Sequence, residues 1–137
     1  MKYLFAMAPL ALLAACGGKT EVAAQTANTE ATAPSLASSD GPPEAFAQCA
    51  VCHKVAAADG NAVGPNLHGV VGRKAGSVPG YTYSTAMKDW GQTWTDENLD
   101  KFLTNPRALV AGTRMSFMGQ ADPQKRKDII AWLKKNN

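Results

Sequence analysis

The stretch Cys49-Ala50-Val51-Cys52-His53 concentrates the chemistry of this chain in five residues. Two cysteines at positions i and i+3 project from one side of a helical turn, and a histidine follows the second cysteine directly. The stretch holds two of the three cysteines and one of the two histidines in 137 residues. Two thiols beside an imidazole indicate a redox pair, a metal site or a covalently attached cofactor.

The spacing favours the third of these chemistries. In a C-x-x-C-H motif the two thiols add to the vinyl groups of one haem, and the histidine offers its imidazole to the iron. A thioredoxin-like pair is expected near a βαβ pattern, which the sequence lacks. A zinc site needs two more ligands at a second paired spacing, and the remaining candidates in the domain are His68 and scattered carboxylates. We therefore predict one haem c, bound through Cys49 and Cys52, with His53 on the iron. A disulfide-bonded or thiol-redox protein without haem remains the alternative.

The N-terminus reads as an export signal. Residues 1–16 begin with a single cation, Lys2, and then run apolar or small, over a length too short to span a bilayer. Their end, Leu13-Ala14-Ala15-Cys16, resembles the lipobox of bacterial lipoproteins, in which cleavage precedes the cysteine and lipid is attached to its sulfur. We expect residues 1–15 to be a signal peptide and Cys16 to be lipidated on the periplasmic side of a bacterial membrane. An ordinary signal peptide that contains a cysteine is the alternative.

Composition divides the rest of the chain in two. Residues 16–40 are rich in Ala, Thr and Ser, contain no aromatic residue and show no sustained apolar period, so we expect a flexible tether. Residues 41–137 form the predicted domain, with twelve Lys and Arg against eight Asp and Glu, a net excess of four positive charges. The cations are scattered, which argues against a nucleic-acid partner. A mildly positive surface can still steer an acidic protein partner.

The domain reads as all-α, with long glycine-containing loops. We expect a helix after Pro43, a second with Thr95 as its N-cap that ends by Asn105, and a third with Asp122 as its N-cap. The segment between the first two alternates poorly and carries many glycines, so no β-sheet is predicted. The glycines at positions 64, 69, 72, 76 and 80 are expected to be turn residues.

A haem iron with one histidine ligand has a sixth position to fill. Met115 and Met118, in the stretch GTRMSFMG at residues 112–119, both offer a thioether sulfur. This soft, neutral ligand favours ferrous iron and raises the reduction potential. Most methionines only fill a core, and chemistry alone does not choose between these two.

A family resemblance chooses between them. The motifs CAVCH, GPNLHGVVGRKAG, YTYSTAMK, TW, NPRALVAGTRM and DIIAWLKK follow one another over residues 41–137 in the order of class I cytochrome c of the mitochondrial and alphaproteobacterial type. The resemblance implies a small all-α cytochrome fold of three to five helices around one covalently bound haem. It makes Met115 the distal iron ligand and leaves Met118 beyond it.

The resemblance also implies how the cofactor is surrounded. Pro65 would lie against the His53 ring, with a backbone carbonyl of its neighbourhood accepting the imidazole N–H. The remaining contacts, to the haem propionates, would come from Arg73, Tyr83, Trp94 and Thr113. His68 is expected at the surface as a solvated or capping residue.

Three positions depart from the family pattern. Phe102 occupies the position of a tyrosine found in many relatives, and Met87 occupies that of an asparagine. Ala111 replaces a proline just before the ligand loop. The hydrogen bonds around the distal ligand are therefore expected to differ from those of the mitochondrial proteins.

The function that the resemblance implies is electron transport. A monomeric carrier would shuttle single electrons in a respiratory chain, from a cytochrome bc complex to a terminal oxidase, through transient electrostatic docking and while anchored to the membrane. No acid–base pair or nucleophile constellation appears, so we expect no enzymatic activity beyond electron transfer. A gas-binding haem domain with a labile methionine ligand is the alternative.

Overall fold

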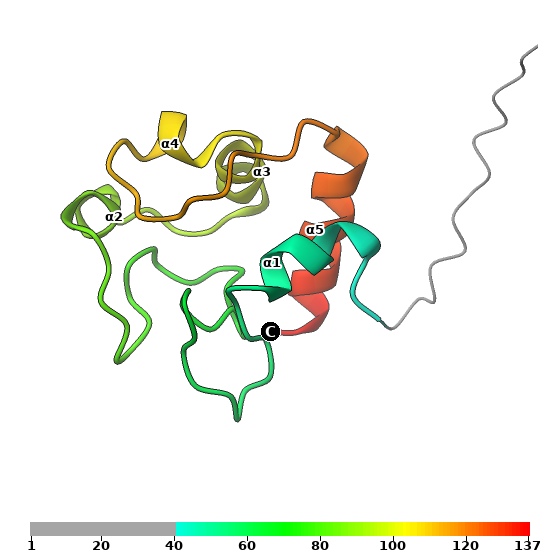
Figure 1. The fold of residues 1–137 in the computed structure, drawn as a ribbon, viewed down its shortest axis with the longest axis horizontal. Helices are drawn as coiled ribbons and strands as arrows, with labels where there is room; N and C mark the ends of the chain where they lie inside the picture. The colour runs from blue at the N-terminus through cyan, green and yellow to red at the C-terminus, as the bar shows by residue number, and fades with distance from the viewer. Residues whose placement is uncertain (1–40) are drawn as a thin grey trace, which may run out of the picture. The chain divides into compact units, whose positions relative to one another are not determined.

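The computed structural model describes residues 41–137, and the predicted signal peptide, Cys16 and tether lie outside them. These residues form an all-α domain, as predicted, and they contain one isolated β-bridge, between Lys74 and Thr93, but no β-strand (Figure 1). The helical elements, in chain order, are η1 Glu44–Phe46, α1 Ala47–Ala50, α2 Thr85–Trp90, α3 Asp96–Thr104, α4 Pro106–Leu109 and α5 Pro123–Lys135.

The three predicted helices are present: the first is the short η1–α1 pair after Pro43, and the other two begin at the predicted N-caps. Thr95 accepts a hydrogen bond from the Asn98 amide at the start of α3, and α3 ends at Thr104, two residues before Pro106. Asp122 accepts from the Gln124 and Lys125 amides at the start of α5. Local capping chemistry therefore fixes these ends in the way the sequence indicates.

Two short helices were not predicted. The N-cap of α2 is Ser84, which accepts from the Met87 amide, and α2 ends at Gly91 in the left-handed region with φ of 48°. In α4, Asn105 is the N-cap and Pro106 stands at the first helical position. Both have clear capping residues, but six-residue and four-residue helices are too short to show an apolar period.

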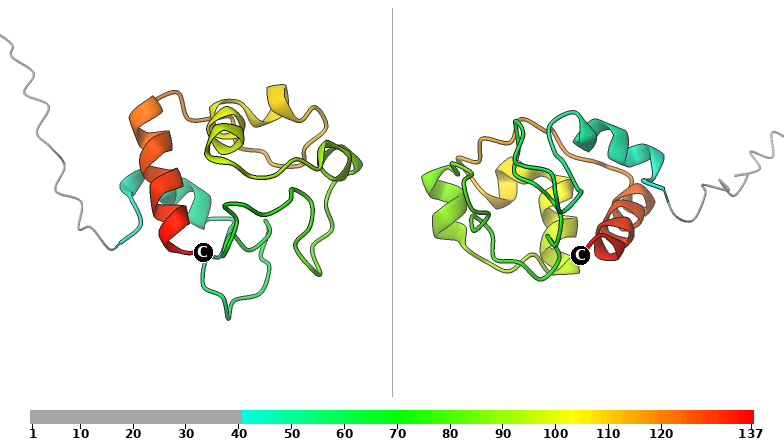
Figure 2. Two further views of the ribbon diagram at one scale, coloured as in Figure 1. Left: turned by 180° about the vertical axis from the view of Figure 1, so that it is seen from behind. Right: turned by 90° about the horizontal axis from the view of Figure 1, so that it is seen from below.

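The helices enclose a single core. The N-terminal segment packs against α5, where the Phe46 and Trp132 ring centroids are 4.5 Å apart, and α3 packs against both α4 and α5. Trp90, Trp94 and Phe102 form a chain of aromatic contacts with centroid separations of 4.9 Å. Figures 1 and 2 show the long segment between α1 and α2 on the side of the domain away from α4.

The described residues contain no helix with both the length and the apolar character to cross a membrane.

Candidate cofactor site

The long segment between α1 and α2 and the helices together line a cavity. All nine residues that the sequence analysis assigned to the cofactor line it: Cys49, Cys52, His53, Pro65, Arg73, Tyr83, Trp94, Thr113 and Met115. They come from α1, the loop that follows it, the approach to α2, the approach to α3 and the segment after α4. The fold therefore brings together residues spread over 67 positions of sequence, from 49 to 115.

The motif CAVCH forms a helical turn at one wall of this cavity. The amides of Cys52 and His53 both donate to the Cys49 carbonyl, at 3.0 and 2.9 Å. Cys49 and Cys52 both line the cavity and form no disulfide with each other. Burial raises the pKa of the Cys49 thiol, so this group stays protonated at neutral pH.

His53 is held by the loop opposite it. Its Nδ1 lies 2.7 Å from the Pro65 carbonyl oxygen, which accepts from the ring when Nδ1 is protonated. Two backbone bonds bracket this contact, from Gly64 to the Cys52 carbonyl at 2.7 Å and from Leu67 to the Lys54 carbonyl at 2.8 Å. Burial lowers the pKa of the imidazole, and the Pro65 contact acts in the opposite direction. The result is a neutral imidazole of fixed orientation with Nε2 left over, which is the form that binds a metal.

Gly64 differs from the turn role expected for it. Gly69, Gly72, Gly76 and Gly80 do have positive φ, but Gly64 does not. A Cβ at Gly64 would meet the His53 ring, at 2.6 Å from Nδ1 and 2.8 Å from Nε2. Glycine is required there because the imidazole packs directly on the backbone.

Asn66 organises the same loop, a role that the sequence analysis missed. It is 9% exposed, and its side chain donates to the Ala56 and Asp59 carbonyls and accepts from the His68 amide. His68 itself does not line the cavity. A buried asparagine between a proline and an apolar residue is the signal that could have indicated this role.

The two methionines of GTRMSFMG are separated by their surroundings. Met115 lines the cavity and is half-buried, and its amide donates to Thr113 Oγ1 at 3.3 Å. Met118 is 78% exposed and is not part of the cavity wall. Of the two sulfurs, only that of Met115 belongs to a side chain that faces the site.

The charges around the cavity are all of one sign. Arg73 and Arg114 line it, and the described residues of its wall include no Asp or Glu. Arg73 is half-buried and donates to the His68 and Asn66 carbonyls at 2.7 and 3.0 Å, which leaves further N–H donors. Burial is the main cause that lowers the pKa of Arg73 and raises that of Tyr83, so the phenol is neutral.

The rest of the wall is apolar. Phe102 and Met87, two of the departures from the family pattern, are 6% and 7% exposed and line the cavity, while Ala111 is exposed. Apolar side chains from α3 and α5 complete the wall: Leu99, Leu103, Ile129 and Leu133.

These residues fit one kind of group. Two thiols, a neutral imidazole, a thioether and two guanidinium groups around an apolar cavity match a large apolar macrocycle that carries a soft-to-borderline metal and acidic substituents. No group of three or more His, Cys, Asp or Glu side chains in residues 41–137 is arranged to hold a metal ion by itself. The fold and the donor set together define a c-type cytochrome.

Comparisons with known proteins agree. The chain belongs to the cytochrome c family, whose model matches residues 40–137. It is 51% identical over 90 residues to cytochrome c2 of Rhodomicrobium vannielii, an alignment that covers 66% of this chain and 72% of that protein. It is 55% identical over 80 residues to cytochrome c of Trypanosoma brucei brucei, covering 57% of this chain and 86% of the relative. Among solved structures, cytochrome cH from Methylobacterium extorquens matches with a TM-score of 0.63 and 48% identity, over 66% of this chain and 91% of that one.

The family membership confirms the predicted cofactor and the predicted class of activity. The protein is a class I c-type cytochrome with one covalently bound haem, and it is an electron carrier rather than an enzyme.

Proposed function

We propose that this cytochrome is a membrane-tethered electron carrier in which His53 and Met115 would both be ligands of the haem iron. The observation that supports this most directly is the shared cavity, which His53 lines from the α1 side and Met115 from the segment after α4. When bound, haem c supplies a one-electron couple between ferrous and ferric iron. Because His53 and Met115 would both be bound to the iron, no substrate needs to bind at the metal.

Each part of the cavity wall then has a role. Cys49 and Cys52 would form the two thioether bonds to the haem. The Pro65 carbonyl fixes the orientation of the His53 ring, and Gly64 leaves room for that ring. The Met115 thioether would raise the reduction potential, because it favours the less charged ferrous iron. Arg73, Tyr83, Trp94 and Thr113 line the cavity and would offset the cost of burying the propionate charges.

The N-terminal segment suits a carrier that stays on one membrane. Residues 1–15 are removed on export, Cys16 carries the lipid, and residues 17–40 separate the anchor from the domain at 41–137. The domain then works on the periplasmic side of a bacterial membrane. A tether confines it near a membrane-bound donor and acceptor, for which we propose a cytochrome bc complex and a terminal oxidase.

The proposed Met115 ligand is tested with visible spectra of the native protein, Met115→Ala and Met118→Ala in both redox states. Met115→Ala should lose the iron–sulfur absorption band, whereas Met118→Ala should keep it. Loss of the band in Met118→Ala alone would reverse the assignment. Rapid binding of carbon monoxide to the native ferrous protein at neutral pH would favour a gas-binding domain instead.

The tether is tested by fractionating cells that express the full chain or Cys16→Ser. Native protein should sediment with membranes and release into detergent, with a mass that includes acyl chains on Cys16. Cys16→Ser should appear in the soluble periplasmic fraction with its haem in place. Equal membrane association of both proteins would contradict lipid anchoring at Cys16.

A further inference from the structure

The segment that carries Met115, residues 110–122, is fixed at its ends and has few backbone hydrogen bonds in its middle. It connects α4 to α5. Near its start, the Thr113 amide donates to the Val110 carbonyl at 3.0 Å. Among the described residues, the backbone of residues 114–119 makes no backbone–backbone hydrogen bond, and the Met115 amide donates to a side chain. Side chains hold the middle, since Arg114 Nη1 donates to the Thr82 carbonyl at 3.3 Å and both Met115 and Phe117 pack against the core. With so few backbone bonds, the position of the Met115 sulfur also depends on how firmly the two ends are held.

The far end of the segment is held against α3. The Gln120 amide donates to the Leu103 carbonyl at 2.8 Å. Gly119 lies so close to the end of α3 that a Cβ would meet the Thr104 carbonyl carbon at 3.0 Å and its oxygen at a shorter distance. Backbone contact of this kind positions the chain, but it does not by itself prevent the end from lifting away.

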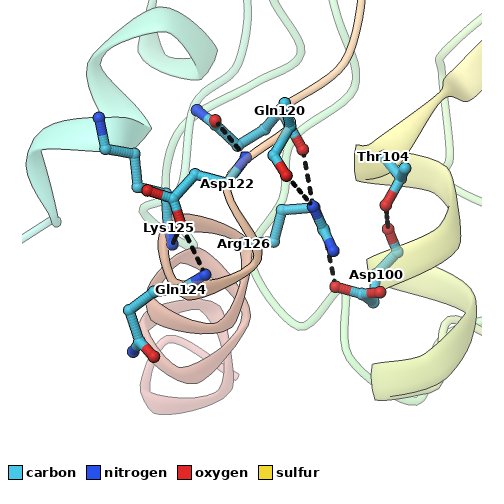
Figure 3. Close-up of polar contacts among 8 residues, drawn as sticks. Asp100, Thr104, Gln120, Asp122, Gln124, Lys125 and Arg126 are labelled. Carbon is cyan, nitrogen blue, oxygen red and sulfur yellow. Dashed lines mark hydrogen bonds and ion pairs between the residues drawn. The ribbon is translucent and has the colours of Figure 1, made fainter.

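Arg126 closes this end from α5. Its Nη1 donates to the Gln120 and Ala121 carbonyls, each at 2.9 Å, and its Nε donates to Asp100 Oδ1 on α3 at 2.8 Å (Figure 3). The residue is only 9% exposed although it is charged. A guanidinium is planar and presents its donors in a fixed fork, so these three bonds hold the end of the segment, α3 and α5 in one geometry.

We propose that Arg126 is a positioning residue for the distal ligand, because it fixes the end of the segment from which Met115 reaches the iron. The proposal rests on the proposed function, namely on Met115 ligation. Without the fork, the Gln120 and Ala121 carbonyls lose their charged donor, and the fraction of molecules with Met115 off the iron increases. An added ligand then binds that open fraction more readily, since apparent affinity scales with the population of the competent state.

The test is imidazole binding to the ferric full-length holoprotein, followed in the visible spectrum, together with the pH at which the iron–sulfur band is lost. Arg126→Gln should bind imidazole roughly tenfold more tightly than the native protein, which corresponds to the loss of a charge-assisted hydrogen bond. The pH at which half of the iron–sulfur band is lost should fall by about one unit. If release of Met115 is coupled to loss of one proton, a tenfold larger equilibrium constant for release shifts this midpoint by that amount. Arg126→Lys keeps the charge without the fork and should lie between the two.

Two variants separate positioning from general stability. Lys134 and Asp96 form an exposed ion pair of 2.6 Å that also joins α5 to α3 but does not touch the segment, so Lys134→Gln should leave imidazole affinity unchanged. Ile130→Ala removes a buried α5 side chain that does not line the cavity, and it serves as a variant of reduced unfolding stability.

The inference and the proposed function fail in different ways. If Arg126→Gln matches Ile130→Ala in imidazole affinity and pH midpoint at a similar loss of stability, the positioning role is wrong. If the native protein shows no Met115-dependent iron–sulfur band, the proposed ligation is wrong before Arg126 is considered.

Discussion

The Nδ1 atom of His53 lies 2.7 Å from the Pro65 carbonyl oxygen, and the same loop places Gly64 against the face of the imidazole ring. A single tripeptide, Gly64-Pro65-Asn66, therefore gives the ring its hydrogen bond, its steric clearance and, through the buried Asn66 side chain, a rigid support. Orientation of a ligating histidine by a backbone carbonyl sets its tautomer and its basicity.

The contact at Gly64 predicts an unusually large effect for a glycine-to-alanine change. Gly64→Ala places a methyl group within 3.0 Å of the His53 ring, so either the loop or the ring has to shift. We expect the free energy of unfolding of the holoprotein to fall by about 1–3 kcal/mol, the usual cost of overpacking. Denaturant titration measures this.

Gly60→Ala is the matched control, because an added Cβ there would meet nothing within 4 Å and its φ is not positive. Its free energy of unfolding should stay within about 0.5 kcal/mol of the native value. Equal stability of the two variants would show that the His53 ring does not rest on Gly64.

The burial of Tyr83 predicts that the free energy of unfolding depends on pH in the alkaline range. Burial raises the pKa of this phenol, while Arg73 and the Val78 backbone act against the increase. Above about pH 10 the unfolded chain releases the proton more readily than the folded protein does, so stability falls as pH rises through the folded pKa. Tyr83→Phe removes this group, and its unfolding free energy should decline less steeply between about pH 9 and 11. Parallel profiles for the native protein and the variant would contradict the prediction.

The position of Arg114 at the edge of the cavity predicts that the rate of electron exchange with an acidic partner depends modestly on ionic strength. Arg114 lines the cavity and is exposed, and the large exposed apolar residues of the domain, Val51, Val63 and Met118, belong to the segments that form or flank the cavity wall. At low ionic strength, Arg114→Gln should slow electron exchange with an acidic partner protein by about fivefold, the value of one ion pair in water. At high salt the difference should disappear. Stopped-flow rates against ionic strength measure it.

Lys127→Gln, on α5, removes the same charge away from the cavity and should change these rates much less. If Lys127→Gln and Arg114→Gln slow the reaction equally, net charge rather than the cavity edge determines the encounter.

The sequence was sufficient to predict helix ends wherever the chemistry of a single residue determines them. Thr95 and Asp122 cap the helices they were expected to cap, and Pro106 ends α3. The short helices α2 and α4 were not predicted, because their few residues show no apolar period. Their capping residues, Ser84, Gly91 and Asn105, were the signal that could have indicated them.

The site was predictable in its residues more than in its geometry. CAVCH identifies thiols and an imidazole by their chemistry. The choice of Met115 over Met118 required alignment with the family motifs, and it agrees with the structure, in which Met115 lines the cavity and Met118 is exposed. The clearance at Gly64 depends on a side chain eleven positions away, and the Arg126 fork joins segments that are adjacent only after folding. Such contacts leave no periodic signal in the chain.

The packing of the N-terminal segment on α5 predicts where stability can be changed without altering the site. Phe46 is 3% exposed and its ring lies 4.5 Å from that of Trp132, which does not line the cavity. Trp132→Ala should lower the free energy of unfolding by about 2–4 kcal/mol, since it removes a large half-buried ring and its contact with Phe46. Trp132→Phe keeps a ring beside Phe46 and should cost about 1 kcal/mol. Denaturant titration gives both values, and the visible spectrum at neutral pH should be unchanged in both variants. A spectrum altered in Trp132→Ala but not in Trp132→Phe would mean that this aromatic contact also supports the cofactor site.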